Sequence, residues 1–186
     1  MNRPKTPSNA LIRSAVREEA AIISYVLRQA FVEFEPLYTP EAFAATTPTS
    51  AQIQKRWSEG SVWVVAEGSQ IVGTISAVPK AEGFYIRSMA VIPSHRGRGL
   101  GYLLLQTVEH AAKTQGIRRM FLSTTPFLTG AIRLYEQFGF HRNDPPHELS
   151  GTPLFTMVKL IEPVNQAHQS GINSPIEKKK VRTDEE

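Results

Sequence analysis

The sequence predicts a mixed α/β fold in which helices flank a twisted, mixed sheet. Residues 61–92 contain three strand-like runs joined by short turns, which is the pattern of an antiparallel meander. A long amphipathic helix over residues 99–115 then separates a strand at 84–92 from a strand at 118–124, and these three segments form a central β-α-β unit. The two strands of such a unit are parallel neighbours joined by a right-handed crossover.

The first 60 residues are expected to form one short strand and two helices. Residues 10–15 form the strand, and a helix follows from Arg17 to about residue 31, with an apolar side made of Ala20, Ile23, Leu27, Ala30 and Phe31. Ser50 is expected to cap a second short helix that ends at Gly60. Between the helices, residues 33–48 are rich in proline and threonine and carry three exposed-looking aromatic residues, Phe34, Tyr38 and Phe43.

The remaining elements follow the same periodicities. A hairpin-like turn, Glu67-Gly68-Ser69, separates the strands at 61–66 and 70–78, and Pro93 ends the strand at 84–92 because proline has no N–H for a ladder. Gly116 is expected to end the long helix. A helix bounded by Gly139 then follows the strand at 118–124. The last elements are this helix at 128–138, strands at 140–142 and 154–160, and a polar, proline-rich connection at 143–153.

Composition excludes several classes of protein. The chain has no cysteine, which excludes a disulfide scaffold, a cysteine nucleophile, an iron–sulfur cluster and a thiolate zinc site. The histidines form no pair at metal-ligand spacing, so we expect no metal. No apolar run approaches the roughly 20 residues that cross a bilayer, and Met1–Asn9 has no apolar signal core. We therefore expect a cytoplasmic protein without a membrane partner.

The net charge of +4 lies in the middle of the chain. Residues 61–160 hold 10 basic and 6 acidic side chains, whereas the segments on either side nearly balance. This excess suits an anionic ligand but is too small to indicate a nucleic-acid partner.

Composition also predicts how the chain is divided. We expect a flexible N-terminus over residues 1–9, one domain over residues 10–161 and a disordered tail over residues 162–186.

A loop of glycine and arginine joins the strand at 84–92 to the long helix. It reads Arg96-Gly97-Arg98-Gly99-Leu100-Gly101. Glycine lets backbone N–H groups approach a ligand closely, and the N-terminus of the following helix adds unpaired N–H donors and the positive end of a dipole. Arg96 and Arg98 add cations that can grip phosphate oxygens. The loop therefore predicts a diphosphate-binding site.

Two common phosphate-binding loops do not fit this segment. A Walker loop carries Lys and then Ser or Thr after its last glycine, and this chain has neither there. The dinucleotide fingerprint needs G-x-G-x-x-G, whereas the spacing here is G-x-G-x-G, and no strand ending in an acid follows about 20 residues later. A flexible basic turn stays as one alternative. A nucleic-acid-binding loop, with salt-sensitive affinity, is the other.

Two motifs resemble the signatures of the GNAT superfamily of N-acetyltransferases. The segment Val91-x-Pro93-x-x-Arg96-x-x-Gly99-x-Gly101 is similar to its acetyl-CoA signature, and Ala131-x-x-Leu134-Tyr135-x-x-x-Gly139-Phe140 is similar to its second signature. Both occur in the family's order and spacing, and the resemblance covers roughly residues 10–160. It implies a GNAT-like sheet, an N-acetyltransferase domain over residues 10–161, and an acyltransferase that uses acetyl-CoA as its co-substrate.

The resemblance also implies how the co-substrate is bound. The strand at 84–92 is expected to carry a bulge and to splay from the strand at 118–124, with the pantetheine arm in the gap. Leu128 stands where the family often has an asparagine that touches the cofactor, which implies altered contacts there. The implied cofactor-binding residues are Met89, Ala90, Val91, Arg96, Gly97, Arg98, Gly99, Leu100 and Gly101.

The resemblance implies direct transfer of the acetyl group to an amine, which suits a chain without cysteine. Tyr135 matches the family's general acid, which protonates the departing thiolate. Tyr85 stands where the family usually has a glutamate base. A base acting through ordered water is one alternative, and the others, chosen by residue type alone, are Glu82, Glu33, Glu35 and His147.

The acceptor amine is expected to lie against residues 33–48 and 143–153, which contain acids together with aromatic or proline residues. The sequence leaves open whether that amine belongs to a small molecule or a protein, how long the acyl chain is, and whether the protein is a homodimer. A non-catalytic CoA-binding sensor of the same fold is the alternative function. Tyr85 favours the sensor slightly, and Tyr135 disfavours it.

Overall fold

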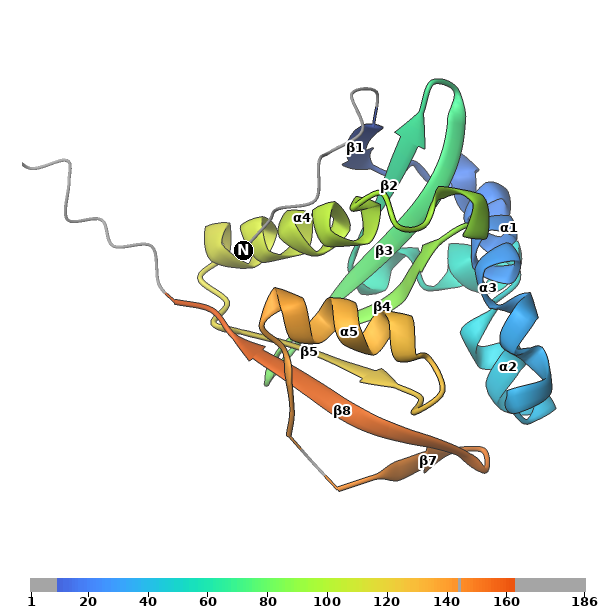
Figure 1. Cartoon of the computed structure of the whole chain (residues 1–186). Helices are drawn as coiled ribbons and strands as arrows, with labels where there is room; N and C mark the ends of the chain where they lie inside the picture. The colour runs from blue at the N-terminus through green and yellow to red at the C-terminus, as the bar shows by residue number, and fades with distance from the viewer. Residues whose placement is uncertain (1–9, 144, 163–186) are drawn as a thin grey trace, which may run out of the picture.

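The computed structural model describes residues 10–143 and 145–162 (Figure 1). The expected flexible N-terminus, residues 1–9, lies outside the described residues, as do residues 163–186 of the expected tail and Asp144 of the expected acceptor segment. The domain boundaries therefore stay a prediction.

The described part of the chain forms a mixed sheet of eight strands. Its order is β1-β2-β3-β4-β5-β8-β6, with β7 paired to β8 off this path. The first four strands pair antiparallel in sequence order, and β4 pairs parallel with β5. The predicted meander and β-α-β unit are thus confirmed. The strands are β1 (Ala10–Ser14), β2 (Ser61–Glu67), β3 (Gln70–Lys80), β4 (Gly83–Val91), β5 (Arg119–Thr124), β6 (His141–Arg142), β7 (His147–Leu149) and β8 (Thr152–Leu160).

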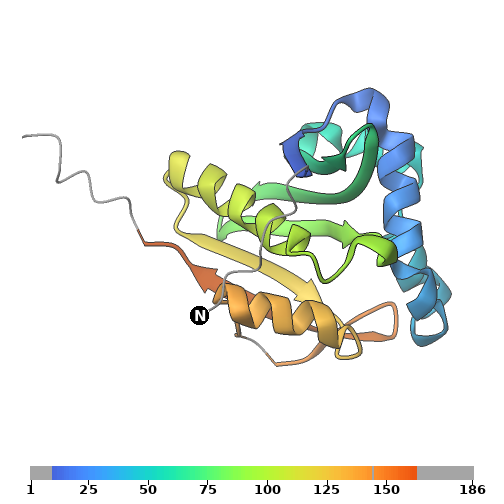
Figure 2. The same cartoon turned by 45° about the horizontal axis from the view of Figure 1, so that its top comes forward.

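Helices cover both faces of this sheet. Helices α1 and α4 each contact β3 and β4, and α5 packs beside α4 (Figure 1 and Figure 2). Strand β3 is buried continuously from Ile71 to Val78, which is the expected result when helices shield both faces of a strand. The helices are α1 (Ala20–Phe31), α2 (Pro40–Thr46), α3 (Ser50–Lys55), α4 (Leu100–Thr114) and α5 (Thr129–Phe138), and short 3-10 turns join several of them.

The segment at 33–48 is more ordered than its composition suggests. It forms a 3-10 turn, Val32–Leu37, and then α2. Helix α2 begins here because the side chain of Thr39 caps it and Pro40 occupies its first turn, where a missing N–H costs nothing. Phe43 is only 6% exposed, so the expectation that it is an exposed aromatic residue was wrong.

The second short helix also begins differently from the prediction. Thr49, not Ser50, is the N-cap of α3, and its side chain accepts a hydrogen bond from the backbone N–H of Gln52. The Gln52 side chain accepts in return from the backbone N–H of Thr49, which completes a capping box. The two reciprocal hydrogen bonds satisfy two backbone N–H groups at the start of the helix, and a cap at Ser50 would leave these groups without these partners.

Strand β4 carries a bulge and separates from β5. Thr74 of β3 pairs with Ala90, but Ser76 pairs with Arg87, so β4 contains one extra residue at this point. Ser88 lies within the extra stretch and has a positive φ of 52°. The parallel pairing of β4 with β5 is confined to Phe84 and Tyr85. The bulge and the splay that the resemblance implied are therefore present.

Lys159 of β8 joins the two helices that lie beside this gap. Its ammonium group donates to Glu109 of α4 at 3.1 Å and to the carbonyl of Phe138, the last residue of α5, at 2.7 Å. It also lies 3.9 Å from the centre of the Phe138 ring. Lys113 pairs with the same carboxylate at 2.9 Å. One carboxylate and two ammonium groups thus hold α4, α5 and β8 together.

We expect Glu109→Gln to lower the free energy of unfolding by about 1–3 kcal/mol near pH 7, because Lys159 loses its charged acceptor. Burial raises the pKa of Glu109, but the hydrogen bonds from Lys113 and Lys159 outweigh burial and hold that pKa below its ordinary value of 4.5. A lowered native-state pKa stabilises the fold above the unfolded-state pKa, and this stability is lost as pH falls through the native value.

Urea unfolding of both proteins near pH 7 and at about pH 3 measures this effect. The gap in stability between wild type and Glu109→Gln should shrink at the acidic pH. A gap that stays constant would show that the charge on Glu109 contributes nothing.

Candidate active site

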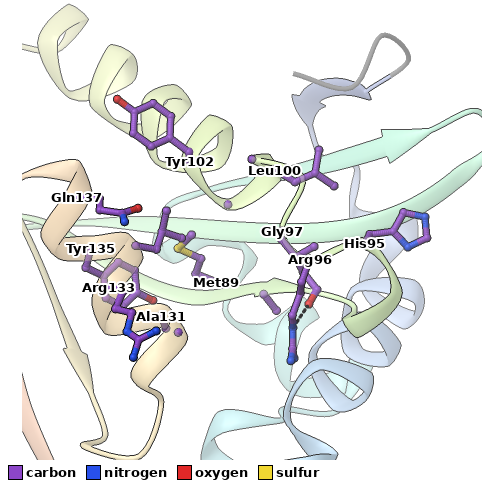
Figure 3. A pocket seen from close by; sticks show the side chains of 16 residues that line it. Met89, His95, Arg96, Gly97, Leu100, Tyr102, Ala131, Arg133, Tyr135 and Gln137 are labelled. Atoms are coloured by element: carbon purple, nitrogen blue, oxygen red, sulfur yellow. Dashed lines mark hydrogen bonds between the residues drawn. The ribbon is translucent and has the colours of Figure 1, made fainter. Parts of the chain in front are cut away.

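A cavity of about 720 Å³ opens between α4, α5 and the end of β4. Figure 3 shows its walls, with α5 on one side and the glycine loop on the other. Three segments line it: the end of β4, the loop and first turn of α4, and one face of α5. The lining residues are Met89, Ala90, Val91, His95, Arg96, Gly97, Gly99, Leu100, Gly101, Tyr102, Gly130, Ala131, Arg133, Leu134, Tyr135 and Gln137.

Two glycines of the loop adopt backbone conformations that other residues avoid. Gly97 has a φ of 73°, and Gly99, the N-cap of α4, has a φ of 78°. A Cβ atom at Gly97 would meet no other atom within 4 Å, so the space beside it is open. The first N–H groups of α4 have no carbonyl partner within the helix. The loop thus presents bare backbone and a helix N-terminus to the cavity, an arrangement that binds anions.

Gly101 has a packing role that the motif alone does not reveal. A Cβ atom there would lie 2.7 Å from Cδ2 of Leu134 and 3.4 Å from Cε of Met89. The missing side chain lets α4 approach α5, and this close approach shapes the floor of the cavity.

The two arginines of the loop are paired within the protein. The guanidinium of Arg96 donates to the carbonyls of Val91 at 3.1 Å and Ala30 at 2.6 Å, and it also pairs with Glu33. These contacts fasten the loop to the end of α1. Arg96 thereby positions the loop and does not extend freely into the cavity.

Arg98 does not line the cavity. It pairs with Glu67 of β2 at 2.9 Å, and the ring of His95 lies 3.7 Å from the other oxygen of the same carboxylate. The structure therefore brings eight of the nine predicted cofactor-binding residues to the cavity and leaves Arg98 beside it.

The end of β4 presents to the cavity a strand edge that β5 does not cover. Met89, Ala90 and Val91 line it, and within the described residues β4 has no partner on its β5 side beyond Tyr85. An extended ligand with amide groups can pair with such an open edge in the way that an added strand does. The side chains of these residues pack against the core, so ligand pairing places no demand on their type.

Tyr135 reaches the cavity from α5 and is only 8% exposed. Burial raises the pKa of its phenol above the ordinary value, and the Tyr38 phenol adds to this rise. Tyr135 therefore keeps its proton throughout the physiological pH range. It is in the right state to donate a proton and not to accept one.

None of the base candidates lines the cavity within the described residues. Glu33 pairs with Arg96, and Glu35 lies 3.8 Å from Arg28. Tyr85, at the position of the missing glutamate, packs its ring against Phe121 of β5 with the centroids 5.3 Å apart. The other candidates, Glu82 and His147, also lie outside the cavity lining. Leu128, which stands at the position of the family's asparagine, is the N-cap of α5 and does not line the cavity either.

The two expected acceptor segments touch one another. The backbone N–H of Thr39 donates to Oγ1 of Thr152 at 3.0 Å, and the Thr39 hydroxyl donates to the carbonyl of Ser150 at 2.8 Å. Next to this contact, aromatic rings gather around Tyr38, whose ring centroid lies 4.8 Å from that of Phe127 and 6.0 Å from that of Phe43. Phe34 stacks on Phe127.

Sequence reasoning missed most of the α5 wall. Gly130, Arg133 and Gln137 line the cavity, as does Tyr102 of α4. Helix periodicity could have identified the three α5 residues. Positions three and four apart on a helix share one face, and Gly130, Arg133 and Gln137 have this spacing and lie in or next to the Ala131–Phe140 motif.

Within residues 10–143 and 145–162, no cluster of three acidic or histidine side chains could hold a metal, and no helix is long and apolar enough to cross a membrane.

Curated relatives of the chain are N-acetyltransferases by name. It is 27% identical over 144 residues to the uncharacterized N-acetyltransferase YjgM of Escherichia coli K12, an alignment that covers 74% of this chain and 86% of the relative. It is 32% identical over 99 residues to the probable N-acetyltransferase family 8 member 5 of Mus musculus. That match covers 50% of this chain and 44% of the mouse protein, so the chain spans less than half of this relative.

Solved structures share the fold. The PaiA N-acetyltransferase of Thermoplasma acidophilum in complex with coenzyme A superposes with a TM-score of 0.69 at 18% identity, over 81% of this chain and 98% of that one. A GNAT family acetyltransferase of Elizabethkingia anophelis with acetyl-CoA bound gives a TM-score of 0.62 at 19% identity, over 83% and 99%. The sequence model of the acetyltransferase (GNAT) family matches residues 27–140. The chain therefore belongs to the acetyltransferase (GNAT) family and is an enzyme of the acyltransferase class.

Proposed function

We propose that this protein transfers an acetyl group from acetyl-CoA directly to the amine of an acceptor. The observation that carries the proposal is the cavity between the N-terminus of α4 and the open edge of β4, with Tyr135 in its wall. The names of the relatives and the coenzyme A ligands of two structural neighbours support the same activity.

The residues of the cavity fit the parts of acetyl-CoA. The diphosphate is held by the amides of residues 97–101, where a glycine without a Cβ leaves the space open. The pantetheine amides pair with the backbone at Met89 and Val91. The acetyl thioester then lies toward Tyr135.

Tyr135 acts as the general acid. The acceptor nitrogen attacks the thioester carbonyl, the C–S bond breaks, and the departing sulfur takes the phenolic proton of Tyr135. The attacking amine loses its proton to water, because no carboxylate of the described residues lines the cavity. Tyr135 recovers a proton from solvent before the next turnover.

The acceptor binds where the segments at 33–48 and 143–153 meet. The Thr39 contacts hold these segments together, and the aromatic rings beside them suit an amine with an apolar part. We further propose a cytoplasmic location, and a homodimer stays a prediction of the sequence.

The alternative of a non-catalytic sensor is separated from the enzyme by turnover. Purified protein is incubated with acetyl-CoA and a panel of small amines and peptides, and the release of free thiol is followed. Release with one class of amine establishes the transferase and identifies its acceptor. Tight binding of acetyl-CoA without release from any amine would favour the sensor.

We expect Gly97→Asp to weaken acetyl-CoA binding about tenfold or more, because its carboxylate would face the diphosphate. Gly97→Asn is the matched control: it has nearly the same shape, both residues tolerate a positive φ, and a Cβ at this position is unobstructed. Calorimetric titration with acetyl-CoA measures both affinities. Equal affinities for the two variants would place the diphosphate elsewhere.

We expect Tyr135→Phe to lower kcat by about 10²-fold while the affinity for acetyl-CoA changes little, since the ring remains and only the acidic proton is lost. Tyr25→Phe serves as the control, because Tyr25 is 55% exposed on α1 and should keep the wild-type rate. A thiol-release assay measures kcat, and calorimetric titration measures the affinity for acetyl-CoA. An unchanged kcat in Tyr135→Phe would remove the acid role.

The raised pKa of Tyr135 also predicts the alkaline behaviour of the wild type. An acid with a raised pKa stays protonated to higher pH, so loss of this proton should not slow the enzyme until above about pH 10, the ordinary value for tyrosine. A decline at lower pH that disappears in Tyr135→Phe would contradict the raised pKa.

A further inference from the structure

The cationic groups of the cavity differ in whether they already have a partner. Arg96 is bound by Glu33 and two carbonyls, and His95 lies beside Glu67. Arg98, just outside, is also paired with Glu67. Arg133 lines the cavity too, and within the described residues no carboxylate pairs with it. It is therefore a cation of the cavity that remains available to an anionic ligand.

Arg133 lies at the mouth of the cavity. It stands on α5 with Gly130 three positions before it and Gln137 four positions after it, so the three share one face of the helix. Arg133 and Gln137 are exposed, whereas Tyr135 is buried. A Cβ atom at Gly130, one turn before Arg133, would meet nothing within 4 Å, so the space beside Gly130 is open. Figure 3 shows Arg133 across the cavity from Gly97 and Arg96.

Coenzyme A carries two separate anionic groups, and the proposed function accounts for only one of them. The diphosphate lies at the amides of residues 97–101, and the thioester end lies at the buried Tyr135. The ribose 3′-phosphate belongs to the opposite end of the ligand, which must lie toward solvent. A phosphomonoester carries between one and two negative charges at neutral pH and matches the forked donors of a guanidinium.

We propose that Arg133 binds the 3′-phosphate of coenzyme A and thereby makes the enzyme prefer coenzyme A to dephospho-coenzyme A. The inference rests on the proposed function and adds a specificity-determining residue to it. Its support is the position of Arg133 at the exposed rim, the open space beside Gly130, and the lack of an acidic partner among the described residues.

The test titrates wild type and Arg133→Gln with coenzyme A and with dephospho-coenzyme A, two ligands that differ only in the 3′-phosphate. We expect the wild type to bind coenzyme A about tenfold more tightly. In Arg133→Gln this ratio should fall close to one, because only the affinity for coenzyme A is lost. Arg133→Lys should restore part of the ratio, since it keeps the charge but not the fork.

Arg118→Gln is the matched control. Arg118 is also an exposed arginine without an acidic partner in the described residues, but it lies outside the cavity. Its loss changes the net charge equally and should leave the ratio at the wild-type value. A drop in the ratio of equal size in this control would show that the overall charge, and not a contact at Arg133, sets the preference.

The other outcomes distinguish the inference from the proposed function. If Arg133→Gln loses affinity for both ligands by the same factor, Arg133 acts on the diphosphate or on the fold, and the inference is wrong. A wild type that binds both ligands equally would also overturn it while leaving the acetyl-CoA site intact. If the wild type binds neither ligand, the proposed function itself fails.

Discussion

The separation of β4 from β5 is the constraint on which the rest of the molecule depends. The two strands pair only at Phe84 and Tyr85, and the bulge around Ser88 turns the remainder of β4 away. A fully paired parallel ladder would close the sheet and leave its backbone groups satisfied internally. The splay instead leaves an open edge beside the N-terminus of α4. The sheet thereby supplies both a cavity and a row of backbone groups that a ligand can pair with.

The ion pairs around the cavity connect the elements that form its walls. Arg96 ties the glycine loop to the end of α1, Arg98 ties it to β2, and Lys159 joins α4 to α5. Because these cations are already engaged, the proposed diphosphate site depends on backbone amides and the helix dipole, which are fixed in place before a ligand arrives. Arg133 also lines the cavity and has no acidic partner within residues 10–143 and 145–162.

Much of the fold and part of the site could be predicted from the sequence. Period-two alternation and turn residues indicated the meander, and the apolar face of residues 99–115 indicated the helix of the β-α-β unit. The glycine spacing pointed to an anion site because positive φ values and bare backbone are local requirements that only glycine meets readily. Local composition misled at residues 33–48, where a threonine cap and a proline in the first helical turn start α2 despite a loop-like sequence. The buried position of Phe43 depends on that helix and could not be predicted without it.

The sequence by itself determined the order of the elements, the position of the glycine loop and the resemblance to the acetyltransferase family, since all of these depend on neighbours along the chain. Tertiary structure alone decided the rest. It paired Arg96 with Glu33, which lies 63 residues earlier, gave Gly101 a packing role against Leu134, and brought residues 33–48 against β8 through Thr39 and Thr152. Contacts between distant segments depend on how the helices and strands pack together. A local sequence pattern therefore does not show which charged side chains will be paired in the fold. For that reason the sequence could nominate Arg96 as a ligand for phosphate, and only the folded chain showed that Arg96 is already paired and that Arg133, in the described part of the chain, lines the cavity without an acidic partner.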